Sequence, residues 1–345
     1  MAHRASKLAF ALAAFGLVAG CADTAPPPAA ISQHAATFTN PLLPSGPDPW
    51  ITQVDGTYYY THTTRDRIAL WRTDDIADLK DAEHAVVWTP PKTGPNAHLI
   101  WAPELHRIDG KWFLYYSATA SGHKDDLHRG VFVLENDSAD PLTGEWIDRG
   151  RVDTRLPGID GTVFRYKGDL YFVYSAYDGP DSALAIARMA NPWTLATPET
   201  VIARPDKAWE RQGGRQIVEG PEFLLGPKGD LFMTYSGSAC WSDDYALGLL
   251  HAAPGADPLD AGAWAKSPGP VFKRGNGVYA TGHNGFFTSP DGSENWIIYH
   301  ANSGPDMGCT PKRAPHIQKF GWTDAGWPDF GEPVPEGEPI PVPSR

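Results

Sequence analysis

The chain repeats one short pattern five times, and the third copy reads Lys167-Gly168-Asp169-Leu170-Tyr171-Phe172-Val173-Tyr174-Ser175. Each copy begins with a turn that contains glycine and continues with a run rich in aromatic and β-branched residues. Such a turn followed by such a run is typical of a hairpin that opens a strand. The other four copies begin at Asp55, Asp109, Lys228 and Asp291.

The spacing of the copies predicts the architecture. Consecutive copies start roughly 60 residues apart, and a unit of that length holds four short strands with their turns. Units too small to bury both faces of a sheet alone must stack on one another. Four-stranded sheets stacked around an axis form a β-propeller, here with five blades. An open solenoid would also repeat, but its units are usually shorter. We therefore expect an all-β, five-bladed β-propeller.

Composition agrees with this fold class and excludes several functions. The 345 residues include 13 Trp, 13 Tyr and 14 Phe, together with 35 Gly and 33 Pro, which suits turn-rich β structure. The 41 acidic and 29 basic residues give a net charge of −12, which argues against a binder of polyanions. The sequence also lacks the G-x-S-x-G, G-x-x-x-x-G-K-[ST] and H-E-x-x-H motifs.

The first residues predict an export signal. Arg4 and Lys7 precede an uncharged apolar run, Leu8 to Val18, which is too short to cross a bilayer comfortably. The run ends in Leu17-Val18-Ala19-Gly20-Cys21, which resembles a bacterial lipoprotein box with a cysteine that becomes acylated. Ordinary signal cleavage near this point is the alternative.

These observations predict the domain organisation. We expect a lipoprotein-type signal peptide over residues 1–21, a Pro/Ala-rich tether over 22–35, one catalytic propeller domain over 36–335 and a Pro-rich tail over 336–345. The expected location is the cell envelope, at the outer membrane or in the periplasm, or otherwise outside the cell. Contact with the membrane is expected only through the lipid on Cys21, and the protein is expected to be a monomer that binds no nucleic acid.

Two cysteines remain after Cys21. Cys240 and Cys309 lie in stretches that follow the fourth and fifth copies of the repeat. In an oxidising compartment such a pair forms a disulfide, and two buried free thiols are the alternative. The cysteines show none of the close spacings that a structural zinc site needs.

A polar residue lies at or beside the start of the strand that precedes each repeat. These residues are Asp48, Glu104, Asp160, Glu219 and His283. In a propeller the innermost strand of each blade lines the central channel, so equivalent positions converge on one mouth of that channel. Acidic residues beside glycine and proline often only cap turns, but five in phase with the repeat favour a site, because clustered carboxylates repel one another unless they are used.

Two kinds of chemistry use clustered carboxylates. Glycoside hydrolysis needs one carboxylate as base or nucleophile and one protonated carboxylic acid for the leaving oxygen. Calcium binding also gathers carboxylates, but an EF-hand loop is absent. The abundance of aromatic residues favours a sugar substrate, and Trp101 is well placed to stack on a sugar ring.

Six blocks of the sequence resemble glycoside hydrolase family 43, whose members are five-bladed propeller enzymes that act on arabinose- and xylose-containing polysaccharides. The blocks are Gly46-Pro47-Asp48-Pro49, Trp101-Ala102-Pro103-Glu104-Leu105-His106, Asp160-Gly161-Thr162-Val163-Phe164, Glu219-Gly220-Pro221, Gly282-His283-Asn284 and the segment from Arg313 to Gly331. Each block alone is weak evidence. Their order and their phase with the repeat carry the resemblance.

The resemblance implies roles for individual residues. Asp48 would be the general base, Glu219 the general acid, and Asp160 the third carboxylate that orients the acid and keeps its pKa raised. Arg313 would bind substrate hydroxyls and influence the nearby carboxylates. His283 would help to hold a hydrated cation, often calcium, and no organic cofactor is expected.

Trp101 and Glu104 are expected to contribute to substrate binding. Family members invert the anomeric configuration, so we expect an inverting mechanism.

Within the family, the sequence most resembles the branch of α-L-arabinofuranosidases and exo-α-1,5-arabinofuranosidases. The expected activity is release of terminal L-arabinofuranose from arabinan or from arabinose-decorated plant polysaccharide. A β-xylosidase or an endo-arabinanase of the same family is an alternative. An alternative of another class is a surface lipoprotein that binds oligosaccharide without cutting it.

Overall fold

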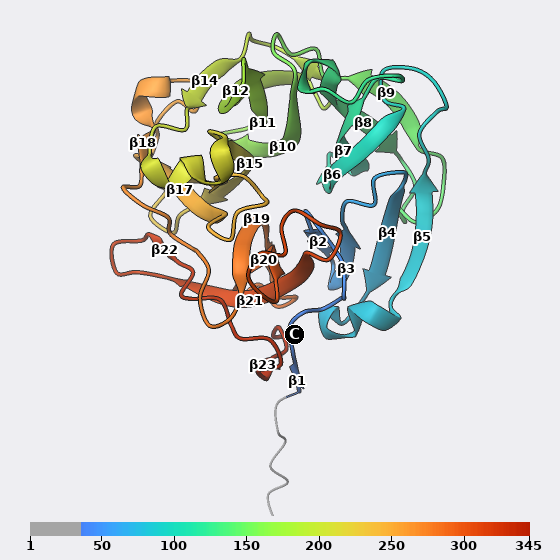
Figure 1. The fold of residues 1–345 in the computed structure, drawn as a ribbon. Helices are drawn as coiled ribbons and strands as arrows, with labels where there is room; N and C mark the ends of the chain where they lie inside the picture. The colour runs from blue at the N-terminus through green and yellow to red at the C-terminus, as the bar shows by residue number, and fades with distance from the viewer. Residues whose placement is uncertain (1–35) are drawn as a thin grey trace, which may run out of the picture. The chain divides into compact units, whose positions relative to one another are not determined.

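The computed structural model describes residues 36–345, which form one compact unit. The predicted signal peptide, the tether and Cys21 lie outside the described residues. Five small antiparallel sheets stand in a ring around a central channel (Figure 1). The prediction of an all-β, five-bladed β-propeller is therefore confirmed.

Each blade is built from one contiguous stretch of chain. Blade 1 contains β2 (Trp50–Val54), β3 (Thr57–Thr61), β4 (Ile68–Thr73) and β5 (Glu83–Trp88). Blade 2 contains β6 (His98–Ile108), β7 (Lys111–Thr119), β8 (Arg129–Asn136) and β9 (Ile147–Arg151). Blade 3 contains β10 (Gly158–Tyr166), β11 (Asp169–Asp178), β12 (Asp181–Asn191), β13 (Thr194–Leu195) and β14 (Thr200–Ala203). Blade 4 contains β15 (Val218–Leu225), β16 (Leu231–Gly237), β17 (Ala246–Ala252) and β18 (Ala265–Lys266). Blade 5 contains β19 (Tyr279–Thr288), β20 (Asn295–Asn302), β21 (Ala314–Trp322) and β22 (Pro328–Asp329).

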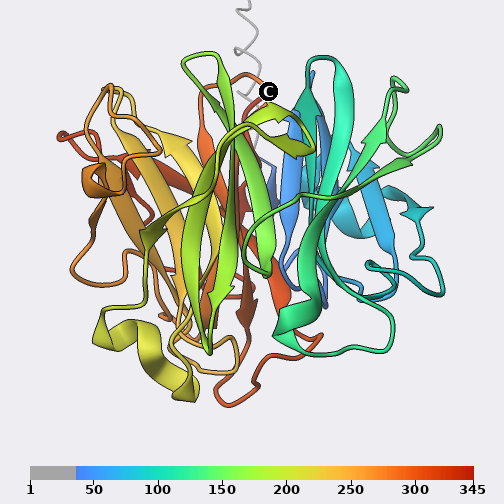
Figure 2. The ribbon, with the colours of Figure 1, turned by 90° about the horizontal axis from the view of Figure 1, so that it is seen from above.

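Short 3-10 helices are the only helices of the described residues: η1 (Ile76–Asp81), η2 (Asp126–His128), η3 (Ala208–Gly214) and η4 (Ala261–Ala263). None of them is long and apolar enough to cross a membrane. Figure 2 shows the ring edge-on, with the blades side by side. The five repeats of the sequence each supply the turn between the first and second strands of a blade and the second strand itself.

Burial on both faces explains the uninterrupted apolar runs of the repeats. In β11, Tyr171 and Val173 pack in the cluster shared with blade 4, whereas Phe172 and Tyr174 pack in the cluster shared with blade 2. Successive side chains of a strand point to opposite faces of the sheet. A blade between two neighbours therefore needs apolar residues at every position of its second strand.

The hydrophobic core is divided among the five junctions between neighbouring blades. Each of five clusters draws its buried residues mainly from two adjacent blades. Trp112 of β7 packs between blades 1 and 2, and Trp296 of β20 packs between blades 5 and 1. Full burial of one large apolar side chain stabilises a fold by about 1.5–3 kcal/mol, so these interfaces hold the ring together.

In every blade a residue with left-handed backbone lies in the first strand or just before it, at the mouth of the channel. These residues are Asp48 (φ 54°), Ala102 (φ 41°), Asp160 (φ 54°), Gly220 (φ 54°) and His283 (φ 49°). In blades 2 to 5 the pairing with the second strand shifts register at this place. Such a bulge redirects side chains, and left-handed backbone costs a non-glycine residue about 1–3 kcal/mol unless its surroundings hold it.

Hydrogen bonds from the preceding blade hold these residues in place. A polar side chain at or just beyond the end of each second strand bonds to the inner strand of the next blade. The acceptors of the four N–H bonds are Thr63 Oγ1 for Ala102 (2.7 Å), Ser117 Oγ for Asp160 (2.8 Å), Ser236 Oγ for His283 (2.7 Å) and His300 Nδ1 for Asp48 (3.1 Å). At the fifth junction Ser175 Oγ donates to the carbonyl of Val218 (2.9 Å).

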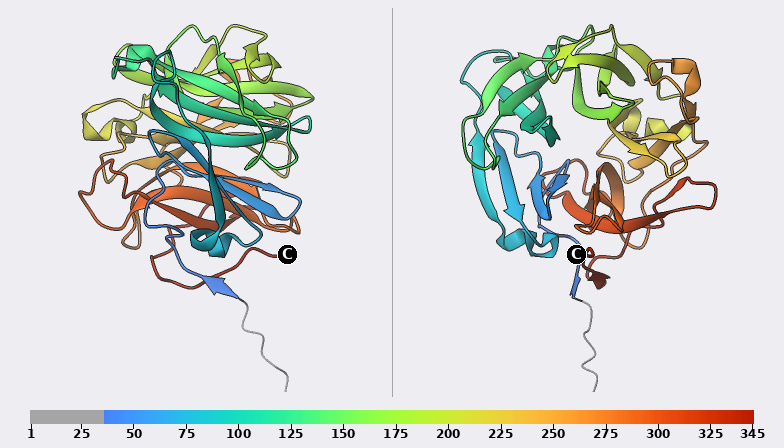
Figure 3. Two further views of the ribbon diagram at one scale, coloured as in Figure 1. Left: turned by 90° about the vertical axis from the view of Figure 1, so that its right-hand side faces the viewer. Right: turned by 180° about the vertical axis from the view of Figure 1, so that it is seen from behind.

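The two ends of the described chain meet beside blades 5 and 1. Strand β1 (Thr37–Phe38) pairs antiparallel with β23 (Ile340–Pro341), and the two lie together below the ring in Figure 3. Phe38 and Ile340 pack in the cluster between these blades. The segment 336–345, which the sequence suggests is a tail, thus includes a strand that packs against the propeller.

A disulfide joins blades 4 and 5. Cys240 follows β16 and Cys309 lies between β20 and β21, and their sulfur atoms are bonded with the Cα atoms 5.2 Å apart. Of the two alternatives left by the sequence, the structure has the disulfide and not two free thiols.

Candidate active site

Asp48 lies at the mouth of the channel with its carboxylate fixed on both sides. Its Oδ1 accepts a hydrogen bond from Arg313 Nη1 (2.9 Å), and its Oδ2 accepts one from Thr63 Oγ1 (2.7 Å). Burial alone would raise the pKa of Asp48, but the positive charges of Arg313 and His283 outweigh burial and hold that pKa well below its usual range. Asp48 is therefore ionised at neutral pH.

Glu219 has the opposite electrostatic environment. It lies one residue before Gly220, the left-handed residue of blade 4, and its Oε1 accepts a hydrogen bond from Tyr245 Oη (2.8 Å). Burial raises the pKa of Glu219, and the negative charge of Asp48 raises it further, against the opposing effects of His283 and Tyr245. Glu219 is thus the carboxyl group of this pair that tends to keep its proton.

Asp160 is buried next to Glu219. Its Oδ2 accepts a hydrogen bond from the backbone N–H of Gly220 (3.2 Å), so it fixes the peptide that follows Glu219. Burial raises the pKa of Asp160 to about 7, and the charges of Glu219 and Asp48 contribute to that rise. Asp160 therefore helps to position Glu219 through the backbone.

Two histidines surround Asp48. His283 Nδ1 is 3.5 Å from Asp48 Oδ1, and the carboxylates around it raise the pKa of His283 despite its burial. His300 is fully buried, and burial together with Arg313 lowers the pKa of His300 to about 3. His300 is neutral and accepts the N–H of Asp48, whereas His283 adds positive charge among the three carboxylates.

A cavity of about 610 Å³ opens above these residues. Its wall includes Asp48, Asp160, Glu219, His283, Arg313 and Trp101. Six of the seven site residues predicted from the sequence are thus together in one cavity.

One face of the Trp101 ring is covered by another side chain of this cavity. The guanidinium of Arg129 lies 3.6 Å from the centre of the Trp101 ring, a cation–π contact that covers one face of the indole. Arg129 itself pairs with Asp126 (3.1 Å), which also lines the cavity. A sugar ring could therefore stack only on the other face of Trp101 while Arg129 stays in place.

Glu104 is the predicted residue that does not reach the cavity. The position of blade 2 that is equivalent to Asp48 and Asp160 is occupied by Ala102, and Glu104 follows after the bulge. Its carboxylate is buried, with His106 Nε2 2.9 Å away. Glu104 is thus not part of the cavity wall, and its role in substrate binding stays a prediction.

Glu104 has a buried carboxyl group as its neighbour. Burial raises the pKa of Glu222 well above its usual range, and the charge and hydrogen bond of the neighbouring Glu104 raise it further. The raised pKa favours the protonated form of Glu222, which can donate a hydrogen bond to its neighbour. This pair lies outside the residues that line the cavity and is therefore structural in our interpretation.

The sequence analysis missed three residues that touch the carboxylates: Thr63, Tyr245 and His300. Thr63 and His300 lie at the ends of the first and fifth repeats, where the other copies have Ser117, Ser175 and Ser236, so their position in the repeat was a usable signal. Tyr245 lies in a loop outside the repeat, and nothing in the sequence distinguishes it.

The ligand atoms near His283 determine which cation could bind beside it. Carboxylate oxygens suit calcium. Within residues 36–345, however, the only place where three His, Cys, Asp or Glu ligand atoms come within 4.8 Å of one another is elsewhere in the molecule. A calcium ion at the channel mouth would accordingly have His283 as its protein ligand and take its other ligands from water.

A propeller channel that presents one ionised and one proton-retaining carboxyl group defines a class of protein, the glycoside hydrolases built on a β-propeller. The model of the family "Glycosyl hydrolases family 43" matches residues 38–328. The chain belongs to glycoside hydrolase family 43, and the resemblance noted in its sequence is confirmed.

Two relatives from Streptomyces support the assignment to this family. The chain is 38% identical over 317 residues to an extracellular exo-α-(1→5)-L-arabinofuranosidase of Streptomyces avermitilis, an alignment that covers 88% of this chain and 65% of the relative. It is 38% identical over 307 residues to an enzyme of the same name from Streptomyces chartreusis, with 86% and 89% covered. This chain therefore spans about two thirds of the length of the first relative and most of the second.

Among solved structures, an α-L-arabinofuranosidase from Lactobacillus brevis superposes with a TM-score of 0.82 at 35% sequence identity. The superposition covers 87% of this chain and 98% of that structure. The propeller is thus matched over nearly its whole extent.

Proposed function

We propose that this protein is an inverting, exo-acting α-L-arabinofuranosidase that releases terminal L-arabinofuranose from arabinan or arabinose-decorated polysaccharide. The observation that carries the proposal is a pair of carboxyl groups on one cavity wall whose pKa values are shifted in opposite directions, lowered for Asp48 and raised for Glu219. The names of the Streptomyces relatives and of the Lactobacillus brevis structure support arabinofuranose as the sugar.

In the proposed mechanism, Asp48 accepts a proton from a water molecule as the water oxygen attacks the anomeric carbon. The bond between that carbon and the leaving oxygen breaks, and Glu219 gives its proton to the leaving oxygen. The attack takes place on the face opposite the leaving group, so the configuration inverts. Asp160 keeps Glu219 oriented through the Gly220 peptide, and Arg313 holds Asp48 and binds substrate hydroxyls.

We also propose roles for two further groups. Trp101 contributes its free ring face to substrate binding. A calcium ion with His283 as its protein ligand would supply positive charge beneath the sugar, and its removal with a chelator, measured as a loss of activity that calcium restores, tests this role.

The relatives named extracellular favour export of this protein. We propose that Cys21 carries a lipid anchor in the cell envelope. Metabolic labelling with a radioactive fatty acid tests this anchor, because Cys21→Ser would abolish the label while an unanchored secreted protein would never acquire it.

The first experiment is product analysis with linear α-1,5-arabino-oligosaccharides, alongside 4-nitrophenyl arabinofuranoside and xyloside. Stepwise release of arabinose is expected, with the inverted anomer formed first in NMR spectra. Internal cleavage or xylose release would move the activity elsewhere in the family, and binding without cleavage would contradict hydrolysis.

Two amide variants test the assignment of the acid. Glu219→Gln is expected to lower kcat by about 100- to 10,000-fold, the usual contribution of general acid catalysis. Glu222→Gln is the matched control, because a protonated carboxyl group and an amide are similar in size and charge. Equal losses in the two variants would overturn the choice of Glu219.

A further inference from the structure

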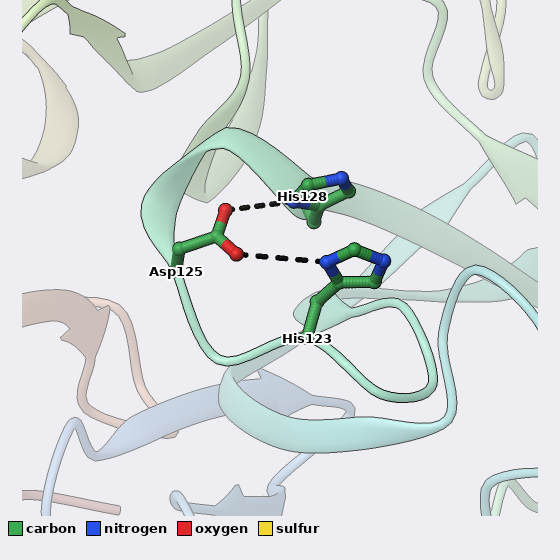
Figure 4. Close-up of side chains that lie close together, drawn as sticks. All are labelled: His123, Asp125 and His128. Carbon is green, nitrogen blue, oxygen red and sulfur yellow. Dashed lines mark hydrogen bonds and ion pairs between the residues drawn. The ribbon is translucent and has the colours of Figure 1, made fainter.

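A second group of ligand side chains lies on the loop between β7 and β8, away from the catalytic carboxylates. His123, Asp125 and His128 turn their side chains toward one another, as Figure 4 shows. Within residues 36–345 this is the only set of His, Cys, Asp or Glu residues with three ligand atoms within 4.8 Å of one another. None of the three lines the catalytic cavity.

The separations between ligand atoms suit a shared ion. Asp125 Oδ1 is 2.7 Å from His128 Nδ1, whereas Asp125 Oδ2 is 3.6 Å from His123 Nδ1. The second distance is too long for a hydrogen bond. Ligand atoms that each lie about 2.0–2.1 Å from a tetrahedral zinc ion stand roughly 3.3 Å apart. The separation between Asp125 and His123 is close to that spacing, whereas Asp125 and His128 form a hydrogen bond that an ion would replace.

The rings of His123 and His128 are stacked on one another. The centres of the His123 and His128 rings are 3.4 Å apart and the rings are nearly parallel, at 20°. Both side chains remain more than 40% exposed, so burial of apolar surface does not hold them together. An imidazole nitrogen binds a metal ion in the plane of its ring, so one of the two rings would have to turn for both Nδ1 atoms to reach the same ion.

The neighbouring acidic residue does not compete for this site. Asp126 turns the other way and pairs with Arg129 (3.1 Å) and Arg215 (3.2 Å) on the cavity wall. Asp125 is therefore left as the single carboxylate that faces the two imidazoles.

We propose that His123, Asp125 and His128 bind one divalent first-row transition metal ion, with zinc as the expected ion and water as the remaining ligand. Two nitrogen ligands and one oxygen ligand suit zinc, copper or nickel, whereas a calcium or magnesium ion takes most of its ligands from oxygen atoms. Because Asp126 follows Asp125 directly, a bound metal would also restrain the loop that supports Arg129 beside Trp101.

Isothermal titration with zinc chloride tests the site. The protein is the full chain with Cys21→Ser, so that a free thiol does not compete, after treatment with a chelator. We expect one zinc ion per chain at this site. His123→Ala and His128→Ala should each weaken its binding at least 10-fold, and Asp125→Asn should weaken it as well.

His98→Ala is the matched control, because His98 is also exposed but has no ligand partners nearby. Circular dichroism of each variant verifies that the propeller is folded. No zinc binding in the parent chain, or equal binding by the parent and the two loop variants, would overturn the proposal. Hydrolysis is not the readout, so this result and the proposed glycosidase activity stand or fall separately.

Discussion

At the scale of single residues, the arginine that touches Asp48 decides the pH at which the base becomes protonated. Arg313→Ala removes the main attraction that keeps the pKa of Asp48 low, so that pKa should rise. A general base works only when ionised, and the acidic limb of the profile of kcat/KM should therefore move to higher pH.

Arg67→Ala is the control for this prediction, since Arg67 lines the same cavity but forms its ion pair with Asp66. Its acidic limb should coincide with that of the parent enzyme. An unmoved limb in Arg313→Ala would contradict the role of Asp48 as the base.

The alkaline limb tests the acid in the same way. Activity should fall as pH rises through the raised pKa of Glu219, because the acid loses its proton. Tyr245→Phe removes a hydrogen bond that favours the ionised form of Glu219, so the alkaline limb should move to higher pH. Movement in the opposite direction would show that Tyr245 acts on another group.

Most residues of the candidate site could be predicted from the sequence, because the repeat indicated their positions around the channel. Glu104 is not part of the cavity wall, since the five inner strands are not equivalent residue by residue. A bulge at Ala102 shifts the direction of the side chains that follow, and the sequence around Pro103 does not reveal it. Tyr245 was missed because contacts from loops depend on the folded ring.

At the scale of the strands, the bonds between second strands and the next blades should contribute to stability as well as to the site. Ser117→Ala leaves the N–H of Asp160 buried without its partner. We expect the free energy of unfolding to fall by about 1–3 kcal/mol, as measured by denaturant titration, together with a loss of kcat.

The exposed Ser303→Ala serves as the comparison and should change stability little. Full stability and activity in Ser117→Ala would mean that the backbone of Asp160 is held by its own blade. The strand character of the repeats, by contrast, could be predicted from the sequence, since burial on both faces makes most of their positions apolar.

At the scale of the whole molecule, the disulfide should limit opening of the ring between blades 4 and 5. It joins residues 69 positions apart, and closing a loop of that length stabilises a protein by about 4 kcal/mol in the chain-entropy model. The double variant Cys240→Ser/Cys309→Ser should therefore melt at a lower temperature than the parent.

A reducing agent should lower the melting temperature of the parent and leave that of the double variant unchanged. Coincident melting curves for the parent with and without reductant would contradict a stabilising role.

The pairing of Cys240 with Cys309 could only be suggested by the sequence, because the approach of their two loops depends on how the blades close.

The pairing of β1 with β23 brings the two ends of the described chain together beside blades 5 and 1. Each blade is one contiguous segment, and the first and last described strands are neighbours. Within the described residues, therefore, no blade combines strands from the N-terminal and the C-terminal parts of the chain. A circular permutant, with residues 36 and 345 joined by a short linker and new termini in the connection between β14 and η3, should fold to the same ring and retain its cavity.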